Sequence, residues 1–328
     1  MRELISPSAS AQDVRLAARH GHLATQTSRL APGHIQANLL VVPRGVASDF
    51  ELLCLRNPVS CPLLGQSSAP GDPYSFTPPG LFRPAVAGGD EAAVDIRKDI
   101  PQYNVYLHGK LIEDKTSVES EWQPDSVAFL IGCSFSFEAA LAAAGLPPRH
   151  WTLNCNVPMY RTKIKLFPAG IFTDAYQIVS MRPYKSKDIE QVRNLTRPYV
   201  KTHGEPVAWG WEAVEELGIR DIQEPEFGDA VSFAAGEVPV FWVCLRRVSK
   251  SDLKADNVTG LWRNTSKRSH GCWGQDRRQG NGTQAGAYAH PRHHREAALQ
   301  RREGPDTIVS SRCEECTVRV DSQLQSAD

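Results

Sequence analysis

The sequence predicts an α/β fold, with a mixed sheet and flanking helices in one compact domain that could be divided into two lobes. Predicted strands alternate with predicted helices through residues 11–243, and prolines in several strands favour sheet edges and antiparallel pairs. Past Val243 apolar residues become sparse and no sustained period appears, which is typical of disorder. We therefore expect an N-terminal extension over 1–10, a folded domain over 11–243, and a basic, disordered tail over 244–328.

Global charge excludes little, because Lys plus Arg and Asp plus Glu both total 37. This balance gives no indication of nucleic acid or an anionic membrane as partner. The chain has no apolar run of membrane-spanning length and no hydrophobic signal segment after its first Met. We expect a soluble cytoplasmic protein, with the mitochondrial matrix as the alternative, in which Cys54, Cys61, Cys133 and Cys155 are free thiols.

The first predicted element is a short amphipathic helix from Gln12 to His20. Arg15 and Arg19 on this helix would also suit an organelle presequence. Glu3 and Asp13 favour a helix of the fold instead, because transit peptides are poor in acidic residues.

The remaining elements follow from local patterns. We predict strands at 37–43, 127–131, 177–183, 203–209, 227–233 and 236–242, and a hairpin over 103–112. We predict helices at 47–55, 187–195 and 213–217. Residues 67–89, rich in Pro, Gly and Ser, should form an irregular, ordered loop, and residues 151–162 should form another loop because they follow neither period.

The stretch from Val127 to Glu138 combines a buried strand with the start of a helix. Five apolar residues precede Gly132, and Ser134 or Ser136 could cap the helix that follows. Because backbone N–H groups at such a turn point outward, Gly132 to Ser134 would be a candidate site for a carboxylate or phosphate.

Eight short motifs follow one another along the chain: residues 31–39 (APGHIQANL), 57–64 (NPVSCPLL), 95–101 (DIRKDIP), 132–138 (GCSFSFE), 156–162 (NVPMYRT), 180–183 (SMRP), 227–229 (FGD) and 236–242 (GEVPVFW). Together, and in this order, they resemble the hydro-lyase family related to D-glutamate cyclase. The resemblance covers about residues 11–243. It implies a lyase that removes water from a small carboxylate or closes an amino dicarboxylic acid into a cyclic amide, without a cofactor.

The resemblance ends abruptly after Trp242. The family continues with a Cys-Gly-Val-Thr-Pro-type turn and a closing His-Ala-Pro-Gly segment, whereas residues 243–248 read VCLRRV and no such closing segment follows. The chain could therefore be an inactive variant. A further alternative is a noncatalytic module that binds a carboxylate metabolite and moves no proton.

Candidate substrate-binding residues occupy three of these motifs. Two arginines, each in an apolar or turn motif, should hold a carboxylate, either of the substrate or of a structural Asp or Glu. Neighbouring polar groups could orient the same ligand. The predicted binding residues are Gly132, Ser134, Asn156, Tyr160, Arg161 and Arg182.

Candidate catalytic residues are fewer. His203 could serve as a general base, although a lone histidine is more often only hydrogen-bonded. Glu237 could be the second acid or base, because an apolar run follows it, and Asp229 is the weaker choice. Cys133 could be a nucleophile, but without a neighbouring base a small packing thiol is favoured.

A metal site is not predicted. The tail offers Cys313 and Cys316 with Cys272 and three histidines, but a single Cys-x-x-Cys pair is a weak indication of zinc. We expect no cofactor and no metal, a small carboxylate as substrate, no nucleic-acid or membrane partner, and a chain that could form homo-oligomers.

Overall fold

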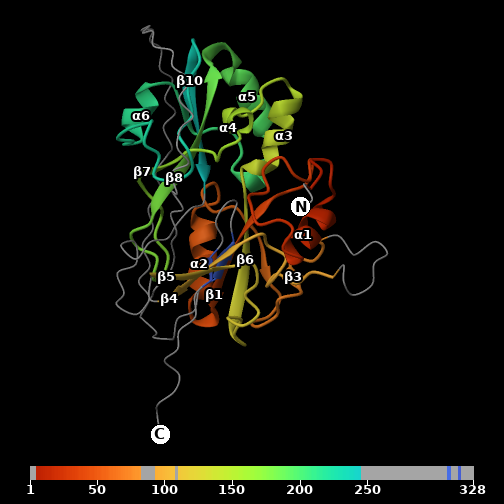
Figure 1. Ribbon diagram of the computed structural model, residues 1–328. Helices are drawn as coiled ribbons and strands as arrows, with labels where there is room; N and C mark the ends of the chain where they lie inside the picture. The colour runs from red at the N-terminus through yellow and green to blue at the C-terminus, as the bar shows by residue number, and fades with distance from the viewer. Residues whose placement is uncertain (1–4, 83–92, 108–109, 245–308, 312–316, 319–328) are drawn as a thin grey trace.

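The structure is a computed structural model that describes residues 5–82, 93–107, 110–244, 309–311 and 317–318 (Figure 1). The chain forms an eight-stranded sheet and a four-stranded sheet, with helices beside both. Apart from the two pairings that β12 makes with β1 and β4, the strand pairs are antiparallel. This arrangement confirms the α/β class. Within the described residues no helix is long and apolar enough to cross a membrane.

The helices are α1 (Ala11–Arg19), α2 (Arg44–Arg56), α3 (Phe135–Ala143), α4 (Arg149–Leu153), α5 (Ile189–Thr196) and α6 (Glu212–Glu216), with short 3-10 helices η2 (Ser186–Asp188) and η3 (Val200–Thr202). The strands are β1 (Ala37–Pro43), β2 (Leu63–Ser67), β3 (Phe76–Thr77), β4 (Tyr103–Leu107), β5 (Lys110–Lys115), β6 (Ser126–Gly132), β7 (Met159–Lys165), β8 (Tyr176–Lys185), β9 (Ala208–Trp209), β10 (Glu237–Cys244), β11 (Val309–Ser311) and β12 (Thr317–Val318).

Strand β6 lies inside the larger sheet, whose order is β3-β2-β6-β1-β11-β12-β4-β5. All seven residues of β6 are buried, as the unbroken apolar run predicted. Val127, Phe129 and Ile131 pack with α2 on one face, whereas Ala128 and Leu130 join a second cluster with Val41 and other side chains. Burial of both faces explains why apolar residues follow one another here without alternating.

The smaller sheet has the order β7-β8-β10-β9. Strands β8 and β10 pair without interruption from Glu237 opposite Lys185 to Cys244 opposite Ile178. One face packs Val240 and Trp242 against α3 and α5, and the other packs Phe241 against α6. Each sheet therefore has its own core, and the two sheets form the two lobes that we expected.

The chain passes from the larger sheet into α3 at Gly132, at the junction of the two lobes. In Figure 1, α3, α4 and α5 lie beside the smaller sheet, while α1 and α2 lie beside the larger one. A Cβ atom at Gly132 would come within 1.9 Å of the backbone oxygen of Lys201 in η3. Only glycine therefore allows η3 to pack against the end of β6.

Three predictions for the smaller lobe differ from the structure. Of the strand predicted at 203–209, only β9 is observed. Residues 151–162, which we expected to form a loop, include the end of α4 and the start of β7. Residues 227–233 form no strand; Phe227 makes only an isolated bridge to Met159. Strand β7 escaped detection because it is an outer strand whose last three residues are exposed, so its burial pattern does not alternate regularly.

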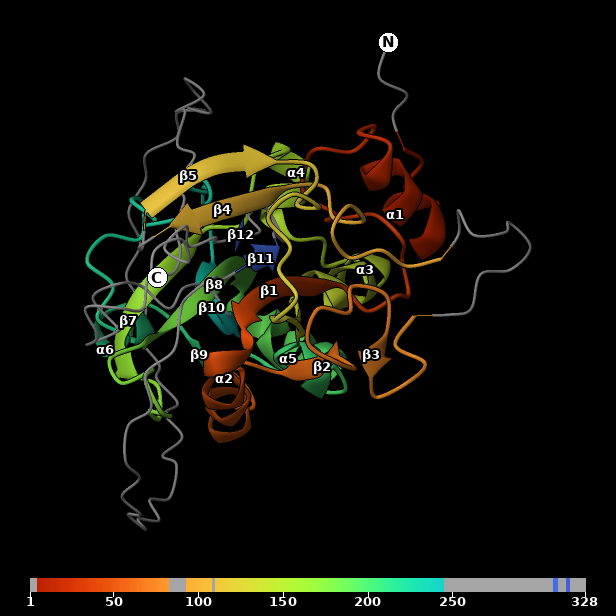
Figure 2. The ribbon, with the colours of Figure 1, turned by 90° about the horizontal axis from the view of Figure 1, so that it is seen from below.

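The structure describes only a small part of the predicted tail. Residues 309–311 and 317–318 form β11 and β12, which lie between β1 and β4 (Figure 2). For these five residues the expectation of disorder is wrong, because long-range pairing to Val41, Leu40 and β4 supplies the partners that a local pattern cannot predict. The rest of the predicted tail, including Cys272, Cys313 and Cys316, lies outside the described residues.

Candidate functional site

The turn after β6 does not offer its first amides to a ligand. The Gly132 N–H donates to the Pro62 carbonyl oxygen at 2.9 Å, and the Cys133 N–H donates to the Gln36 carbonyl oxygen at 3.0 Å. Ser134 and Ser136 also do not cap α3 with their side chains, since Ser136 Oγ instead accepts from the Gln36 N–H at 2.8 Å. The Gly132 and Cys133 amides are therefore satisfied by the protein and do not support the anion site predicted for Gly132 to Ser134, which stays a prediction.

The centre of the site is a buried ion pair between Glu138 in the first turn of α3 and Arg182 in β8. The Glu138 Oε1 atom accepts from Arg182 Nε at 3.0 Å and from Nη2 at 2.5 Å, and both side chains are fully buried. Arg182 also donates to Ser134 Oγ and to Ser180 Oγ, each at 3.1 Å. Of the two roles proposed for Arg182, the structural carboxylate is the one that the contacts support.

Two neighbouring aromatic rings lie against the Arg182 guanidinium. Its Cζ atom lies 5.2 Å from the ring centroids of Phe137 and Trp242, within the range of cation–π attraction. These rings come from α3 and β10, so the two elements that pack on Arg182 also fix its orientation.

The second oxygen of Glu138 binds groups from two further segments. The Oε2 atom accepts from Trp151 Nε1 at 2.8 Å and from Ser28 Oγ at 3.0 Å. Burial by itself would raise the pKa of Glu138, but the positive charge of Arg182 and the contacts of Glu138 with Arg182 and His150 outweigh it and lower the pKa to about 2. Glu138 is therefore ionised near neutral pH, and it lies in the first turn of α3, where the helix dipole favours a negative charge.

His150, in α4, is a member of the cluster that the sequence did not reveal. Its Nε2 atom lies 3.1 Å from Glu138 Oε1, and its ring stacks on Phe135 with the centroids 6.2 Å apart. Neither ring nitrogen makes a well-aligned hydrogen bond to any described residue, although the side chain is only 1% exposed. Burial lowers the pKa of His150 below its ordinary value, so the ring is neutral near pH 7.

His203 follows η3 and lies at the junction of the lobes. Its backbone has a φ of +84°, a left-handed conformation that costs a non-glycine residue free energy and is concentrated at functional sites. Its Nδ1 atom lies 2.8 Å from the Val59 carbonyl oxygen and must carry the ring proton to donate to it. The Nε2 atom is then a bare acceptor, and among the described residues it has no hydrogen-bond partner.

The protonation state of His203 follows from its surroundings. Burial is the main cause that lowers the pKa of His203 to about 4; the Val59 backbone contact opposes it, the positive charge of Arg182 adds to it, and the Gly132 backbone opposes it weakly. The ring is neutral at physiological pH. His203 is thus a buried, oriented base, and its dependence on Arg182 connects it to the Glu138 cluster.

Three predicted binding residues lie on β7 or just before it, away from this ion pair. The Asn156 N–H donates to Asp229 Oδ2 at 2.8 Å, and Tyr160 Oη donates to the Ile222 carbonyl oxygen at 2.6 Å. Burial raises the pKa of Tyr160, and its ring packs in the core on the other face of the sheet. Both contacts are structural.

Arg161 is paired with Ile178 of β8. Every second residue of a strand points to the same face, so residues 178, 180 and 182 share one face, and Arg161 therefore lies on the same sheet face as Arg182. Along β8, the position opposite Arg161 is four residues from Arg182, which corresponds to about 13 Å. No described residue forms an ion pair or a hydrogen bond with its half-buried guanidinium. Its role in binding stays a prediction.

Glu237 is held by protein groups. Its Oε1 atom pairs with Arg149 Nη2 at 2.5 Å, and its Oε2 atom accepts from the Ala234 N–H at 2.7 Å. It faces Lys185 at the end of β10, three residues from the position opposite Arg182. These contacts do not bring Glu237 to His203, and its predicted catalytic role has no support from them.

Cys133 packs with Phe135, Met159 and Ile178 and is 2% exposed, which fits the packing role that we favoured. It is disulfide-bonded, so the expectation of a free thiol is wrong for this residue, and a bonded sulfur cannot act as a thiolate nucleophile. Cysteine pairing depends on proximity in the fold, which spacing along the chain does not determine. Cys54 and Cys61 are free thiols, as expected.

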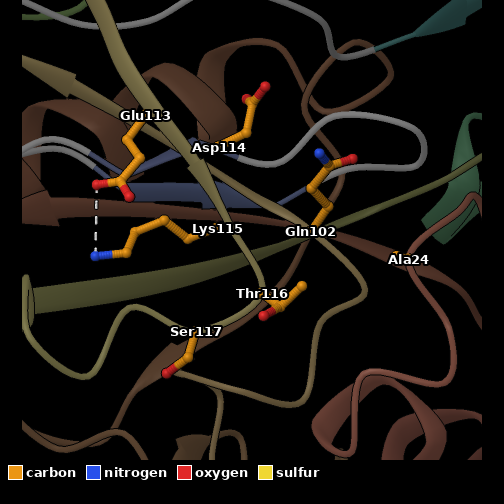
Figure 3. Close-up of a pocket in the computed structure, with 7 residues that line it drawn as sticks. All are labelled: Ala24, Gln102, Glu113, Asp114, Lys115, Thr116 and Ser117. Atoms are coloured by element: carbon orange, nitrogen blue, oxygen red, sulfur yellow. Dashed lines mark ion pairs between the residues drawn. The ribbon is translucent and has the colours of Figure 1, made fainter.

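A separate pocket of about 390 Å³ lies at the far edge of the larger sheet (Figure 3). Its lining includes Gln102 and residues 113–117, and none of the predicted site residues belongs to it. Lys115 pairs there with Glu113 at 3.5 Å and with Glu121 at 2.5 Å. The charge of Lys115 is thus paired with neighbouring carboxylates, and we do not place the functional site there.

Comparison with known proteins identifies related sequences along most of the domain. The family described as D-glutamate cyclase matches residues 127–251, which include α3, β8, β10 and all of β6 except its first residue. A Bordetella pertussis protein named "Putative hydro-lyase" is 46% identical over 241 residues, 74% of this chain and 81% of the relative.

Proteins with the same kind of name occur in distant organisms. The relative from Schizosaccharomyces pombe is 43% identical over 232 residues, 71% of this chain and 73% of its own. The relative from Geobacillus kaustophilus is 40% identical over 235 residues, 72% of this chain and 83% of its own. Each alignment covers more than two thirds of both proteins.

Proposed function

This chain belongs to the hydro-lyase family related to D-glutamate cyclase, and we propose that it is a lyase acting on a small carboxylate or an amino dicarboxylic acid. The specific reaction we propose is the conversion of D-glutamate to 5-oxo-D-proline and water. The observation that carries the proposal is the bare Nε2 atom of His203, which is buried, neutral and without a partner among the described residues.

Cyclisation of an amino dicarboxylic acid needs protons to be transferred from its ammonium nitrogen to the oxygen that departs. The amine nitrogen attacks the carbon of the distal carboxyl group, a C–N bond forms, and one C–O bond breaks. Two protons leave the ammonium nitrogen and both end on the departing oxygen, which leaves as water. Atoms and charge balance, so the reaction requires no redox partner.

A single imidazole suits this transfer. His203 Nε2 would take a proton from the attacking nitrogen and return it to the departing oxygen. The hydrogen bond from Nδ1–H to the Val59 carbonyl keeps the ring in the tautomer that leaves Nε2 free to accept. A positioned acid–base group of this kind contributes about 10²- to 10⁴-fold to a rate.

The Arg182–Glu138 pair has a different task. Because Glu138 already neutralises Arg182, this arginine does not act as an uncompensated binder of substrate carboxylate. It orders Ser134 and Ser180, and its charge adds to burial, the main cause, in lowering the pKa of His203. We therefore assign Arg182 and Glu138 as positioning residues.

The test is to incubate purified full-length protein with D-glutamate and to measure 5-oxoproline by chromatography, with L-glutamate as the stereochemical control. The variant is His203→Asn, because asparagine tolerates a left-handed backbone and its amide could still donate to the Val59 carbonyl, whereas the Nε2 base would be gone. We expect this variant to fold and to lose at least 100-fold in turnover.

Two outcomes would count against the proposal. Binding of D-glutamate by the wild-type protein without turnover would indicate a noncatalytic carboxylate-binding module. Unchanged turnover in His203→Asn would remove His203 from the mechanism. A cooperative unfolding transition of the same preparation excludes an incomplete fold as the reason for a negative result.

A further inference from the structure

A loop near the N-terminus covers the Glu138 cluster and carries an arginine that none of the preceding contacts explains. Ser28 reaches Glu138 Oε2 at 3.0 Å, and Trp151 Nε1 donates to Ser28 Oγ at 2.8 Å. The next residue, Arg29, lies over the Trp151 ring, with its Cζ atom 5.5 Å from the ring centroid. Arg29 is therefore held directly beside the cluster by the tryptophan that hydrogen-bonds to Glu138.

The backbone at Arg29 is strained. Its φ is +71°, and a left-handed conformation of this kind is uncommon for a residue with a long side chain. Gln36 fixes the loop, since its side chain accepts from Thr27 Oγ1 at 2.6 Å and donates to the Leu30 carbonyl oxygen at 3.2 Å. Strain that the surroundings maintain in this way points to a functional reason for the side chain's position.

The charge of Arg29 is not compensated. Arg182 has Glu138, and both Arg15 and Arg19 have Asp99, but no described residue forms an ion pair or a hydrogen bond with the Arg29 guanidinium. Its positive charge nevertheless acts on the cluster: after burial, the charges of Arg182 and Arg29 are what lower the pKa of His150. The neighbouring His150 nitrogens also have no well-aligned partner among the described residues.

The local charge count indicates which ligand fits. Glu138 contributes −1, Arg182 and Arg29 contribute +1 each, and His150 and His203 are neutral near pH 7. The cluster therefore has a net charge of +1. An amino dicarboxylic acid, with two carboxylates and one ammonium group, has a net charge of −1 and would complement it.

We propose that Arg29, held over Trp151, binds the substrate carboxylate that does not react, and that it makes the site selective for dicarboxylic over monocarboxylic acids. This inference rests on the proposed function for the identity of the substrate. It assigns to Arg29 the binding of a carboxylate through a forked, charge-assisted contact, for which a guanidinium is better suited than an ammonium group.

The experiment measures ligand affinity by calorimetry, with glutarate as a dicarboxylate that cannot form a cyclic amide and butyrate as a monocarboxylate. We expect the wild-type protein to bind glutarate at least tenfold more tightly than butyrate. Arg29→Met should weaken glutarate binding at least tenfold and remove most of this preference. Arg29→Lys should retain only part of it.

A second variant separates a binding role from a structural one. Glycine adopts positive φ without strain, so Arg29→Gly should keep or raise the thermal midpoint while it weakens glutarate binding as much as Arg29→Met does. A purely structural arginine would give the opposite pattern, with a lower midpoint and unchanged affinity. Arg193→Met is the matched control, because Arg193 lies over Trp209 at 4.9 Å outside this cluster.

The results also distinguish this inference from the proposed reaction. Affinity that depends on Arg29 without any turnover of D-glutamate would sustain the inference and contradict the cyclase reaction. Turnover with unchanged glutarate affinity in Arg29→Met and Arg29→Gly would sustain the reaction and overturn the inference. Failure of the wild-type protein to prefer glutarate over butyrate would also overturn it.

Discussion

Glu138 and Asp99 are two almost fully buried carboxylates, and each holds arginine side chains from a distant part of the chain. Asp99 binds Arg15 at 2.7 Å and Arg19 at 2.6 Å, and it also accepts from the Asp95 N–H at 2.9 Å. Both arginines further donate to the Ala93 carbonyl oxygen. This cluster fastens α1 to the domain, so the first helix belongs to the fold, as expected.

The cluster around Glu138 has the same ion-pair chemistry but a different periphery. His150 and His203 are buried beside it, and they retain ring nitrogens without well-aligned partners among the described residues. Buried polar groups are normally paired, so such groups need an explanation, and the ligand that we propose would supply one. The two clusters share the ion pair and differ in the neighbouring ring nitrogens. These nitrogens, and not the ion pair itself, therefore distinguish a candidate site from a purely structural cluster.

The largest effect should come from breaking the Glu138 pair. Arg182→Met leaves an ionised, fully buried carboxylate without its cation, and we expect the free energy of unfolding to fall by about 3–5 kcal/mol in urea denaturation. The double variant Glu138→Leu with Arg182→Met should recover much of this loss, because both charges are removed together. A loss below about 1 kcal/mol in the single variant would contradict the buried pair.

The next largest effect is a pH dependence of the free energy of unfolding, to which the groups around Glu138 contribute. The unfolded chain protonates His203 below about pH 6.5, whereas the folded protein does so only below about pH 4. The unfolded state therefore binds more protons in this window, and stability must fall as pH decreases from 6.5 to 4, by on the order of 3 kcal/mol. Glu138 has a folded pKa of about 2, so its contribution is lost between about pH 4.5 and pH 2.

His203→Asn checks this assignment, because it should reduce the slope of the upper window, to which the buried His150 also contributes, and should leave the lower window in place. Guanidinium chloride denaturation at a series of pH values would measure both. An unchanged slope between pH 6.5 and 4 in the variant would assign the dependence to another group.

A smaller effect on the free energy of unfolding is expected at the Asp99 cluster. The Arg15 and Arg19 side chains are 14% and 10% exposed, so water can partly replace a lost carboxylate charge. Asp99→Asn should lower the free energy of unfolding by about 1–3 kcal/mol and should leave glutarate affinity unchanged. A tenfold change in that affinity would show that the two clusters are not independent.

The sequence was most informative where local pattern and final environment coincide. Strands β6 and β10 were predicted because their apolar runs are buried in the interior of the two sheets. Strand β7 and the short α4 were missed because their residues follow no clean period. The pairing of β11 with β1 could not be predicted, since it joins Val309 to Val41 across most of the chain.

The site was predictable only in part for a similar reason. Arg182 and His203 were found because a cation or a lone histidine stands out in its motif, and Glu138 was noticed as a first-turn acid. His150, Ser28 and Arg29 were missed, because their relation to Glu138 depends on contacts between segments far apart in the sequence. Exposure and partners, which decide between a structural and a binding arginine, cannot be determined from residue type.

The central claim is that His203 is a neutral base whose Nε2 atom accepts a proton or a hydrogen bond from the ligand. The most direct measurement is ¹⁵N NMR of the imidazole nitrogens at pH 7, before and after addition of D-glutamate. The account predicts a protonated Nδ1 and a bare Nε2 in the free protein, with a change at Nε2 when ligand binds. A protonated Nε2 in the free protein, or no change at saturating D-glutamate, would contradict it.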